Sequence, residues 1–140
     1  MTTGGRVVLA AHAKLTLRLR VVGVRADGYH LIDADMATLA LHDTVTIDPA
    51  GHGVQIEGPF ADGVPASDDN LVARALRLVG RSAGVAIDKQ IPSGGGLGGG
   101  SADAAAVLLG GLHRFRQRLA AWGRYSVLHG RWSRTGHWHW

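Results

Sequence analysis

The sequence predicts a single α+β domain, and the order of its segments carries that prediction. Leucine-rich and β-branched segments with strand periodicity come first, a helix-patterned segment follows, and a short strand then leads through a glycine-rich loop into a second helix. The chain has 140 residues, of which 46% are hydrophobic and 19% charged, which suits one domain with its own core. It has no cysteine, so disulfides and thiolate metal sites are excluded.

Four strands are predicted in the first part of the chain. The first lies within residues 6–24, because apolar side chains recur there at every second position, namely Leu15, Leu17, Leu19 and Val21. A turn at residues 25–28 ends on Gly28, which is free to adopt a positive φ. The other three strands are expected at residues 35–41, 44–48 and 54–57, and a loop with two prolines and two glycines follows at residues 58–67.

Two helices and one more strand are predicted in the second part. The first helix has Asp68 or Asp69 as its candidate N-cap and Gly84 as its expected end. Its apolar residues recur at helical spacing: Leu71, Ala75, Leu78 and Val79. A short strand is expected at residues 85–87, and the second helix from Ala102 to about Leu112.

The net charge of +4 is unevenly distributed along the chain. Residues 1–103 carry a balance of −2, whereas residues 104–140 hold six arginines and no acidic residue. We therefore divide the chain into a domain at residues 1–113 and a basic tail at residues 114–140, rich in Arg, Trp and His. The tail is interpreted as a basic surface helix with a loose end or, as we favour, as a non-native segment such as a shifted reading frame produces.

Because the basic character belongs to the tail alone, nucleic acid is an unfavoured partner. No secretory signal and no apolar run of membrane-spanning length occurs, so we expect a cytoplasmic protein with no membrane partner. The oligomeric state stays open.

The glycine-rich loop is the most informative motif. It runs from Pro92 to Ser101, between a predicted strand and a predicted helix. Glycines let backbone N–H groups approach a phosphate, and the N-terminus of the following helix favours an anion. The alternative is a flexible linker, which the abrupt helix start at Ser101 disfavours. A P-loop is excluded because no lysine follows the last glycine, and the dinucleotide fingerprint lacks its acidic residue.

At this point the residues resemble a known family, the GHMP kinases. The glycine loop is similar to the family's ATP-binding motif, and three further segments agree in order: residues 13–17, 25–30 and 69–75. Residues 25–30 resemble the form found in members that act on a cytidine-diphosphate-linked methylerythritol. The resemblance covers about residues 6–113. It implies the ribosomal protein S5 domain 2-like fold of a GHMP kinase N-terminal domain, here incomplete, and transfer of a phosphoryl group from ATP with Mg²⁺ to the 2-hydroxyl of that small molecule.

The resemblance also implies a role for each matching residue. Lys14 is the candidate catalytic residue, Thr16, Tyr29 and His30 bind the acceptor, and the hydroxyl of Ser101 is a possible Mg²⁺ ligand. The loop residues that bind ATP are Pro92, Gly94, Gly95, Gly96, Leu97, Gly98, Gly99, Gly100, Ser101 and Ala102. We expect Lys89 to be solvent-exposed, and Asp103 either to lie beside the magnesium or simply to suit the first turn of a helix.

The chain departs from the family pattern in several places. His12 stands where the family usually has Pro, Thr16 where it has Asn, and Leu31 where it has Glu. The family's later G-x-D-V-P segment, with its catalytic Asp, does not occur after Asp103. We therefore expect a truncated or frameshifted chain that is inactive alone. The alternatives are another GHMP kinase, of the homoserine or mevalonate type, or a non-enzymatic basic fragment.

Overall fold

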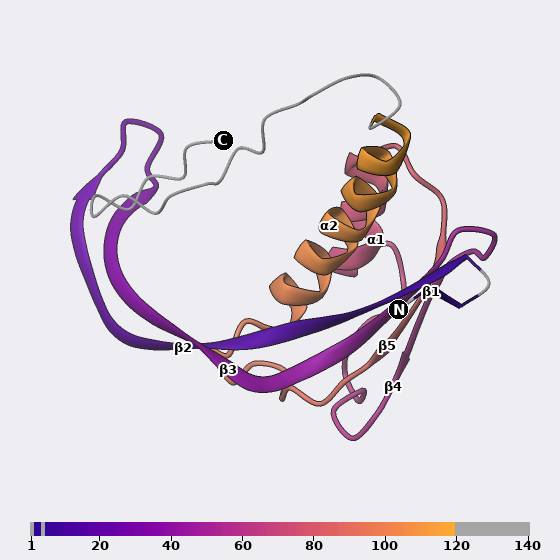
Figure 1. The fold of residues 1–140 in the computed structure, drawn as a ribbon. Coiled ribbons are helices and arrows are strands. Elements are labelled where there is room, and N and C mark those ends of the chain that lie inside the picture. Colours follow the sequence, from indigo (N-terminus) through magenta and orange to yellow (C-terminus); the bar gives the residue numbers. More distant parts are fainter. Residues whose placement is uncertain (1, 4, 120–140) are drawn as a thin grey trace.

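The computed structural model describes residues 2–3 and 5–119, which form one mixed sheet with two helices (Figure 1). The sheet order is β1-β2-β3-β5-β4. Its strands are β1 (Thr2–Thr3), β2 (Arg6–Val24), β3 (His30–Asp48), β4 (Val54–Glu57) and β5 (Gly84–Asp88). All neighbouring strands are antiparallel except β4 and β5, which run parallel. The predicted α+β class is confirmed.

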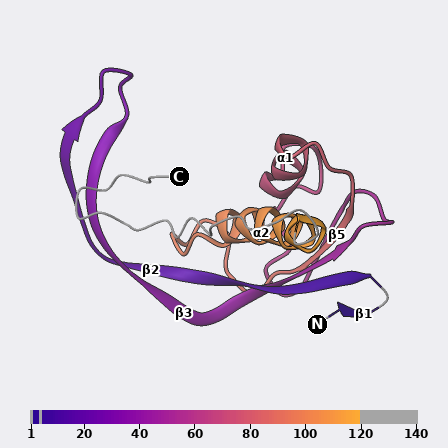
Figure 2. The same cartoon turned by 45° about the horizontal axis from the view of Figure 1, so that its top comes forward.

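The strands β2 and β3 form a long hairpin that dominates the shape of the molecule. Their pairing shifts register between His12 and Lys14 and at two later places toward the tip. Such bulges bend and twist a strand pair, and Figures 1 and 2 show the hairpin curving away from the rest of the sheet. The prediction of two strands at residues 35–41 and 44–48 is wrong, because β3 continues through both and carries Asp43 into the interior.

The two helices, α1 (Leu71–Leu78) and α2 (Gly99–Leu119), pack against each other on one face of the sheet (Figure 2). The core between sheet and helices contains Val45, Val85, Ile87, Val72 and Val107. At Gly110 a Cβ would lie 2.7 Å from the side chain of Ile47 and 3.0 Å from that of Leu9. This glycine therefore allows α2 to approach the sheet closely.

The ends of α1 differ from the prediction. Its N-cap is Asn70, whose side chain accepts a 2.8 Å hydrogen bond from the Val72 N–H, and not Asp68 or Asp69. At the other end Gly80 has a φ of 61°, and the N–H groups of Gly80 and Arg81 bond back to Arg77 and Leu76. These two bonds close a Schellman motif. Gly84, the predicted end, instead begins β5.

Helix α2 is longer than predicted, since it begins at Gly99 and not at Ala102 and extends to Leu119. The predicted domain boundary at residue 113 thus falls within α2, and residues 120–140 of the predicted tail lie outside the described residues. Among the described residues no helix is long and apolar enough to cross a membrane.

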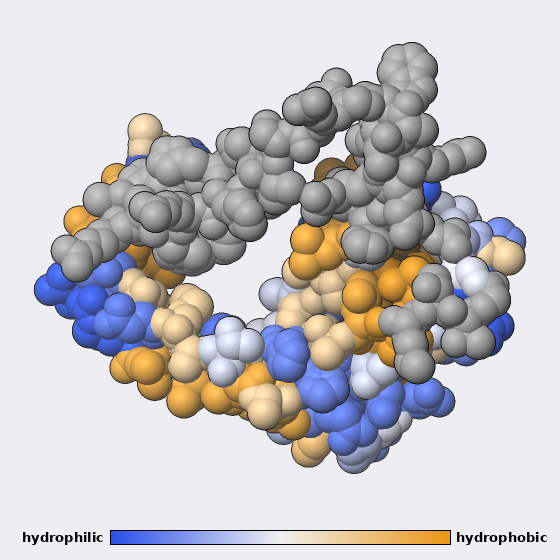
Figure 3. Space-filling model, in the orientation of Figure 1, coloured by the Kyte–Doolittle hydropathy of each residue, from blue (hydrophilic) through white to orange (hydrophobic). Residues whose placement is uncertain are grey.

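Much of the hairpin's apolar surface is uncovered by the described residues, as Figure 3 shows along its strands. Leu17, Leu19 and Val21 are between 53% and 65% exposed. The predicted strand is therefore present, but the alternating leucines of its outer half are not core residues of the described part of the chain.

Candidate functional site

The glycine loop lies between the end of β5 and the start of α2 and lines a hollow of about 280 Å³. Residues 91–101 form most of the wall, and Leu71 and Lys89 complete it. Gly94, Gly96 and Gly98 have φ values of 76°, 72° and 73°, which L side chains rarely adopt. A Cβ at Gly94 or Gly96 would meet no atom within 4 Å, so the loop faces open space there. The hollow is at the small end of the size range of ligand pockets.

Strand β2 is tied directly to this loop through Lys14. The Lys14 N–H donates a 2.9 Å hydrogen bond to the Leu97 carbonyl oxygen. A Cβ at Gly98 would lie 3.3 Å from both Cγ and Cε of Lys14, so the lysine stem runs along the loop. Its ammonium donates to the Thr16 hydroxyl at 2.9 Å. The structure therefore brings together three of the predicted elements: Lys14, Thr16 and the glycine loop.

The beginning of α2 supplies the other half of a possible anion site. The first helical hydrogen bond in this turn runs from the Ala102 N–H to the Gly98 carbonyl oxygen, at 2.9 Å. The N–H groups that precede it have no intrahelical acceptor, and the helix dipole is positive at this end. Ser101 is exposed and lies within the first turn of the helix.

Beneath the loop lies a buried charge cluster formed by Lys89, Asp43 and Asp103, which are 0–2% exposed. The Lys89 ammonium donates to Asp43 at 2.5 Å and to Asp103 at 2.9 Å. The other oxygen of Asp43 accepts the N–H groups of Gln90 and Ile91, at 2.6 and 2.8 Å. One lysine and two carboxylates thus connect β3, the end of β5 and α2 directly below the candidate site.

This cluster corrects two sequence predictions. Lys89 is buried, not solvent-exposed, and its ammonium lies 3.2 Å from the place a Cβ would take on Gly99. Asp103 is paired with Lys89 and is therefore not a free carboxylate. Its Oδ1 is buried and has no hydrogen-bond partner among the described residues. A signal was present in the sequence: Lys89 continues the alternation of the buried residues Val85, Ile87 and Ile91.

Burial and pairing act in opposite directions on the cluster's pKa values. Burial lowers the pKa of Lys89, but the hydrogen bonds and charges of Asp43 and Asp103 outweigh it and hold that pKa above its ordinary value. For Asp103, burial raises the pKa to about 6 despite the opposing effect of Lys89. Desolvation is therefore the dominant influence on this carboxyl group.

Replacing Asp103 by Asn should change how stability depends on pH. The folded-state pKa of about 6 lies above the ordinary 3.8, so the folded chain gains stability from the protonated Asp103 below about pH 4 and loses it as the pH rises through 6. The full difference between the two pKa values corresponds to at most roughly 3 kcal/mol. Since asparagine cannot titrate, Asp103→Asn should be more favourable, relative to the unmodified chain, at pH 8 than at pH 4. Urea unfolding at both pH values measures this, and a constant difference between the two proteins would contradict it.

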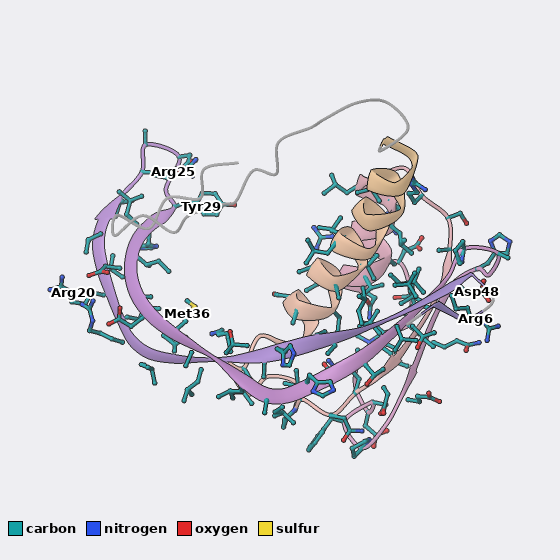
Figure 4. All side chains as sticks on the ribbon, in the orientation of Figure 1. Arg6, Arg20, Arg25, Tyr29, Met36 and Asp48 are labelled. Carbon is teal, nitrogen blue, oxygen red and sulfur yellow. The ribbon has the colours of Figure 1, made fainter. Side chains whose placement is uncertain are left out.

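The hairpin tip carries the other predicted residues and lies apart from the loop. Tyr29 is 70% exposed, its ring lies 5.7 Å from the guanidinium carbon of Arg25, and His30, at the start of β3, is also exposed. Figure 4 shows Arg25 and Tyr29 together at the tip, away from α2. Among the described residues no contact joins Tyr29 or His30 to the glycine loop, so their predicted role in acceptor binding stays a prediction.

The α+β unit has a glycine loop that leads into a helix N-terminus, and a lysine from a neighbouring strand lies against that loop. Proteins commonly bind phosphate groups at such helix N-termini. Residues 70–123 match the family described as the GHMP kinases N terminal domain. Together with the relatives below, this match shows that the chain belongs to the GHMP kinases.

The curated relatives that match this chain carry the name of one particular GHMP kinase. A 4-diphosphocytidyl-2-C-methyl-D-erythritol kinase of Paracoccus denitrificans is 54% identical over 99 residues, which are 71% of this chain and 36% of the relative. The enzyme of the same name from Neisseria meningitidis is 47% identical over 113 residues, 76% of this chain and 40% of the relative. The chain thus spans less than half the length of the curated relatives that it matches.

A solved structure agrees with these relatives. The crystal structure of a 4-(cytidine 5'-diphospho)-2C-methyl-D-erythritol kinase matches with a TM-score of 0.60 and 34% identity, covering 78% of this chain and 41% of the other. The predicted family and its N-terminal domain fold are therefore confirmed.

Proposed function

We propose that this chain binds ATP at the glycine loop and serves phosphoryl transfer to the 2-hydroxyl of 4-diphosphocytidyl-2-C-methyl-D-erythritol, a step of non-mevalonate isoprenoid precursor synthesis in the cytoplasm. The observation that carries the proposal is the contact of Lys14 with the loop, through the Leu97 carbonyl and the face of Gly98. This contact supports the proposal because it brings a cationic side chain next to the backbone that we propose binds the phosphates. The names of the relatives support the choice of acceptor.

In this proposal the loop and the helix terminus hold the phosphates. The exposed backbone of Gly94, Gly95, Gly96 and Gly100 offers N–H donors, and the free N–H groups of the first turn of α2 add the positive end of its dipole. Lys14 places its ammonium where negative charge grows as the phosphoryl group moves, which stabilises the transition state. Thr16 accepts a hydrogen bond from Lys14 and so fixes the position of that ammonium.

We propose that magnesium arrives at the site with the nucleotide. Among the described residues no group of three or more His, Cys, Asp or Glu side chains could hold a metal, and Asp103 is engaged by Lys89. The exposed hydroxyl of Ser101 is the side-chain ligand that we propose for it. When bound, the ion would supply neutralisation of phosphate charge.

The residues that we propose bind the acceptor lie at the tip of the β2–β3 hairpin. Tyr29 and His30 are exposed at the tip, where an aromatic ring could stack on a cytosine. Among the described residues Lys14 has no carboxylate partner that could serve as a general base for the acceptor hydroxyl.

The test is calorimetric titration of the full chain with ATP, with and without Mg²⁺, followed by an acceptor assay. We expect saturable binding of ATP with Mg²⁺ and phosphorylation of the cytidine-linked acceptor in preference to homoserine or mevalonate. Absence of ATP binding by a chain with a cooperative unfolding transition would sink the proposal. Binding of ATP with transfer to homoserine or mevalonate would keep the nucleotide site and refute the acceptor.

Replacing Gly98 by Ala should weaken ATP binding roughly tenfold or more, because a side chain at positive φ costs about 1–2 kcal/mol and presses on Lys14. Its matched control is Gly63→Ala, since Gly63 has a φ of 77° and no atom within 4 Å of a Cβ. Both changes strain the backbone, but only Gly98 touches the candidate site. Equal ATP dissociation constants for the two variants, measured by calorimetry, would show that the loop does not bind the nucleotide.

A further inference from the structure

Two histidines stand opposite each other on the sheet, away from the candidate ATP site. His12 of β2 and His42 of β3 are register partners in the antiparallel pair, and their ring centroids lie 5.2 Å apart at an interplanar angle of 52°. His12 is exposed and His42 partly so, while their neighbours Ala11, Ala13 and Asp43 are buried. Both imidazoles therefore project from the sheet face opposite the helices.

The hydrogen bonds of these rings fix which nitrogen is free. His12 Nδ1 lies 2.9 Å from the Leu39 carbonyl oxygen, and His42 Nδ1 lies 2.8 Å from the Ala40 carbonyl oxygen. A carbonyl oxygen can only accept, so each Nδ1 must carry the proton and donate it. In the neutral form each Nε2 then holds a lone pair, and among the described residues neither Nε2 has a partner.

This arrangement is the one that metal-binding histidines adopt, in which one ring N–H is bonded to a backbone carbonyl and the other nitrogen ligates. Two imidazoles on one tetrahedral zinc, with Zn–N bonds of about 2.0 Å, have their centroids roughly 5 Å apart. The observed centroid spacing of 5.2 Å agrees with that distance. We propose that His12 and His42 form a two-histidine site for a divalent transition cation of the zinc, nickel or copper class, with water completing its coordination.

The chemistry of the pair separates this site from any magnesium that accompanies ATP. Imidazole nitrogens suit zinc, nickel and copper, whereas magnesium prefers oxygen ligands. The two histidines lie on β2 and β3, next to the residues of these strands that contact the glycine loop and the buried charge cluster below it. Lys14 follows His12 across the register shift and bonds to the glycine loop, and Asp43 follows His42 and joins the buried cluster. A bound cation would thus clamp the two strands at the point from which both residues extend.

The experiment is calorimetric titration of the metal-free full chain with Zn²⁺, without nucleotide, in the unmodified form and in His12→Ala and His42→Ala. The chain has eight histidines, so the site is defined by the difference between variants. Each change should remove one class of zinc binding or weaken it roughly tenfold or more. The double variant should bind no more weakly than either single one, because one remaining imidazole no longer chelates. Excess Mg²⁺ should not compete.

The matched control is His52→Ala, since His52 is exposed and its Nδ1 lies near the Ser82 hydroxyl instead of a second imidazole. It should leave zinc binding unchanged, and circular-dichroism melting without metal confirms that each variant is folded. Zinc binding that is the same in His12→Ala, His42→Ala and the unmodified chain would overturn the proposal. Because no nucleotide is present, this result is independent of whether the chain binds ATP.

Discussion

Replacing Lys14 by Met should weaken ATP binding roughly tenfold or more and should slow phosphoryl transfer to the acceptor by roughly 100- to 1000-fold. The first effect is the loss of a charge-assisted hydrogen bond to phosphate, worth about 1.5–3 kcal/mol. The second is the loss of a positioned positive charge as negative charge develops in the transition state. Methionine keeps the length and apolar stem that pack on Gly98, so the loop itself should stay in place. Calorimetry with ATP and single-turnover transfer measure the two effects separately.

The control for this change is Arg81→Met, which removes an exposed cation that lies outside the candidate site. A general effect of net charge on ATP binding would appear equally in both variants. If Lys14→Met bound ATP and transferred phosphate as well as the unmodified chain does, Lys14 would be only a structural residue beside the loop.

Individual strands and helices could be predicted because the patterns that indicate them lie within a few consecutive residues. Alternating apolar residues identified β2, and glycines with a following Ala/Leu segment identified the loop and α2. The element ends were less accurate, as the cap of α1 illustrates. Asp68, Asp69 and Asn70 can all cap a helix, and the choice of Asn70 reflects its second bond, from its side-chain amide to the Pro65 carbonyl oxygen at 2.7 Å. That bond depends on the path of the preceding loop.

The buried cluster could not be predicted because its partners are far apart in the sequence. Asp43 and Lys89 are 46 residues apart, and only the pairing of β3 with β5 brings them together. A lone lysine and a lone aspartate are exposed in most proteins, so composition alone favours the wrong answer. The same reason explains the His12–His42 pair, which depends on the register of β2 against β3. The position of the hairpin tip likewise follows from bulges that no local pattern announces.

Replacing Lys89 by Met should destabilise the chain by about 3–5 kcal/mol, because it leaves two buried carboxylates without their countercharge. Asp43 and Asp103 are 0% and 2% exposed, so water cannot take over the role of the ammonium without opening the fold. The loss is large compared with the total stability of a small domain. Urea unfolding followed by circular dichroism measures it, and Arg74→Met, an exposed change on α1, should shift the midpoint little.

A second substitution distinguishes buried charge from lost packing. If unpaired carboxylates cause the destabilisation, then adding Asp103→Asn to Lys89→Met should restore part of the lost stability, because the double variant buries one charge fewer. If the cause were only the lost contacts of the lysine stem, the second change would add its own cost instead. A double-mutant cycle gives the sign of this coupling, which is of the order of 0.5–3 kcal/mol for groups in contact. If Asp103→Asn raises the free energy of unfolding of the Lys89→Met variant, charge pairing is the main stabilising contribution of the buried cluster. If it lowers that free energy further, packing is the main contribution.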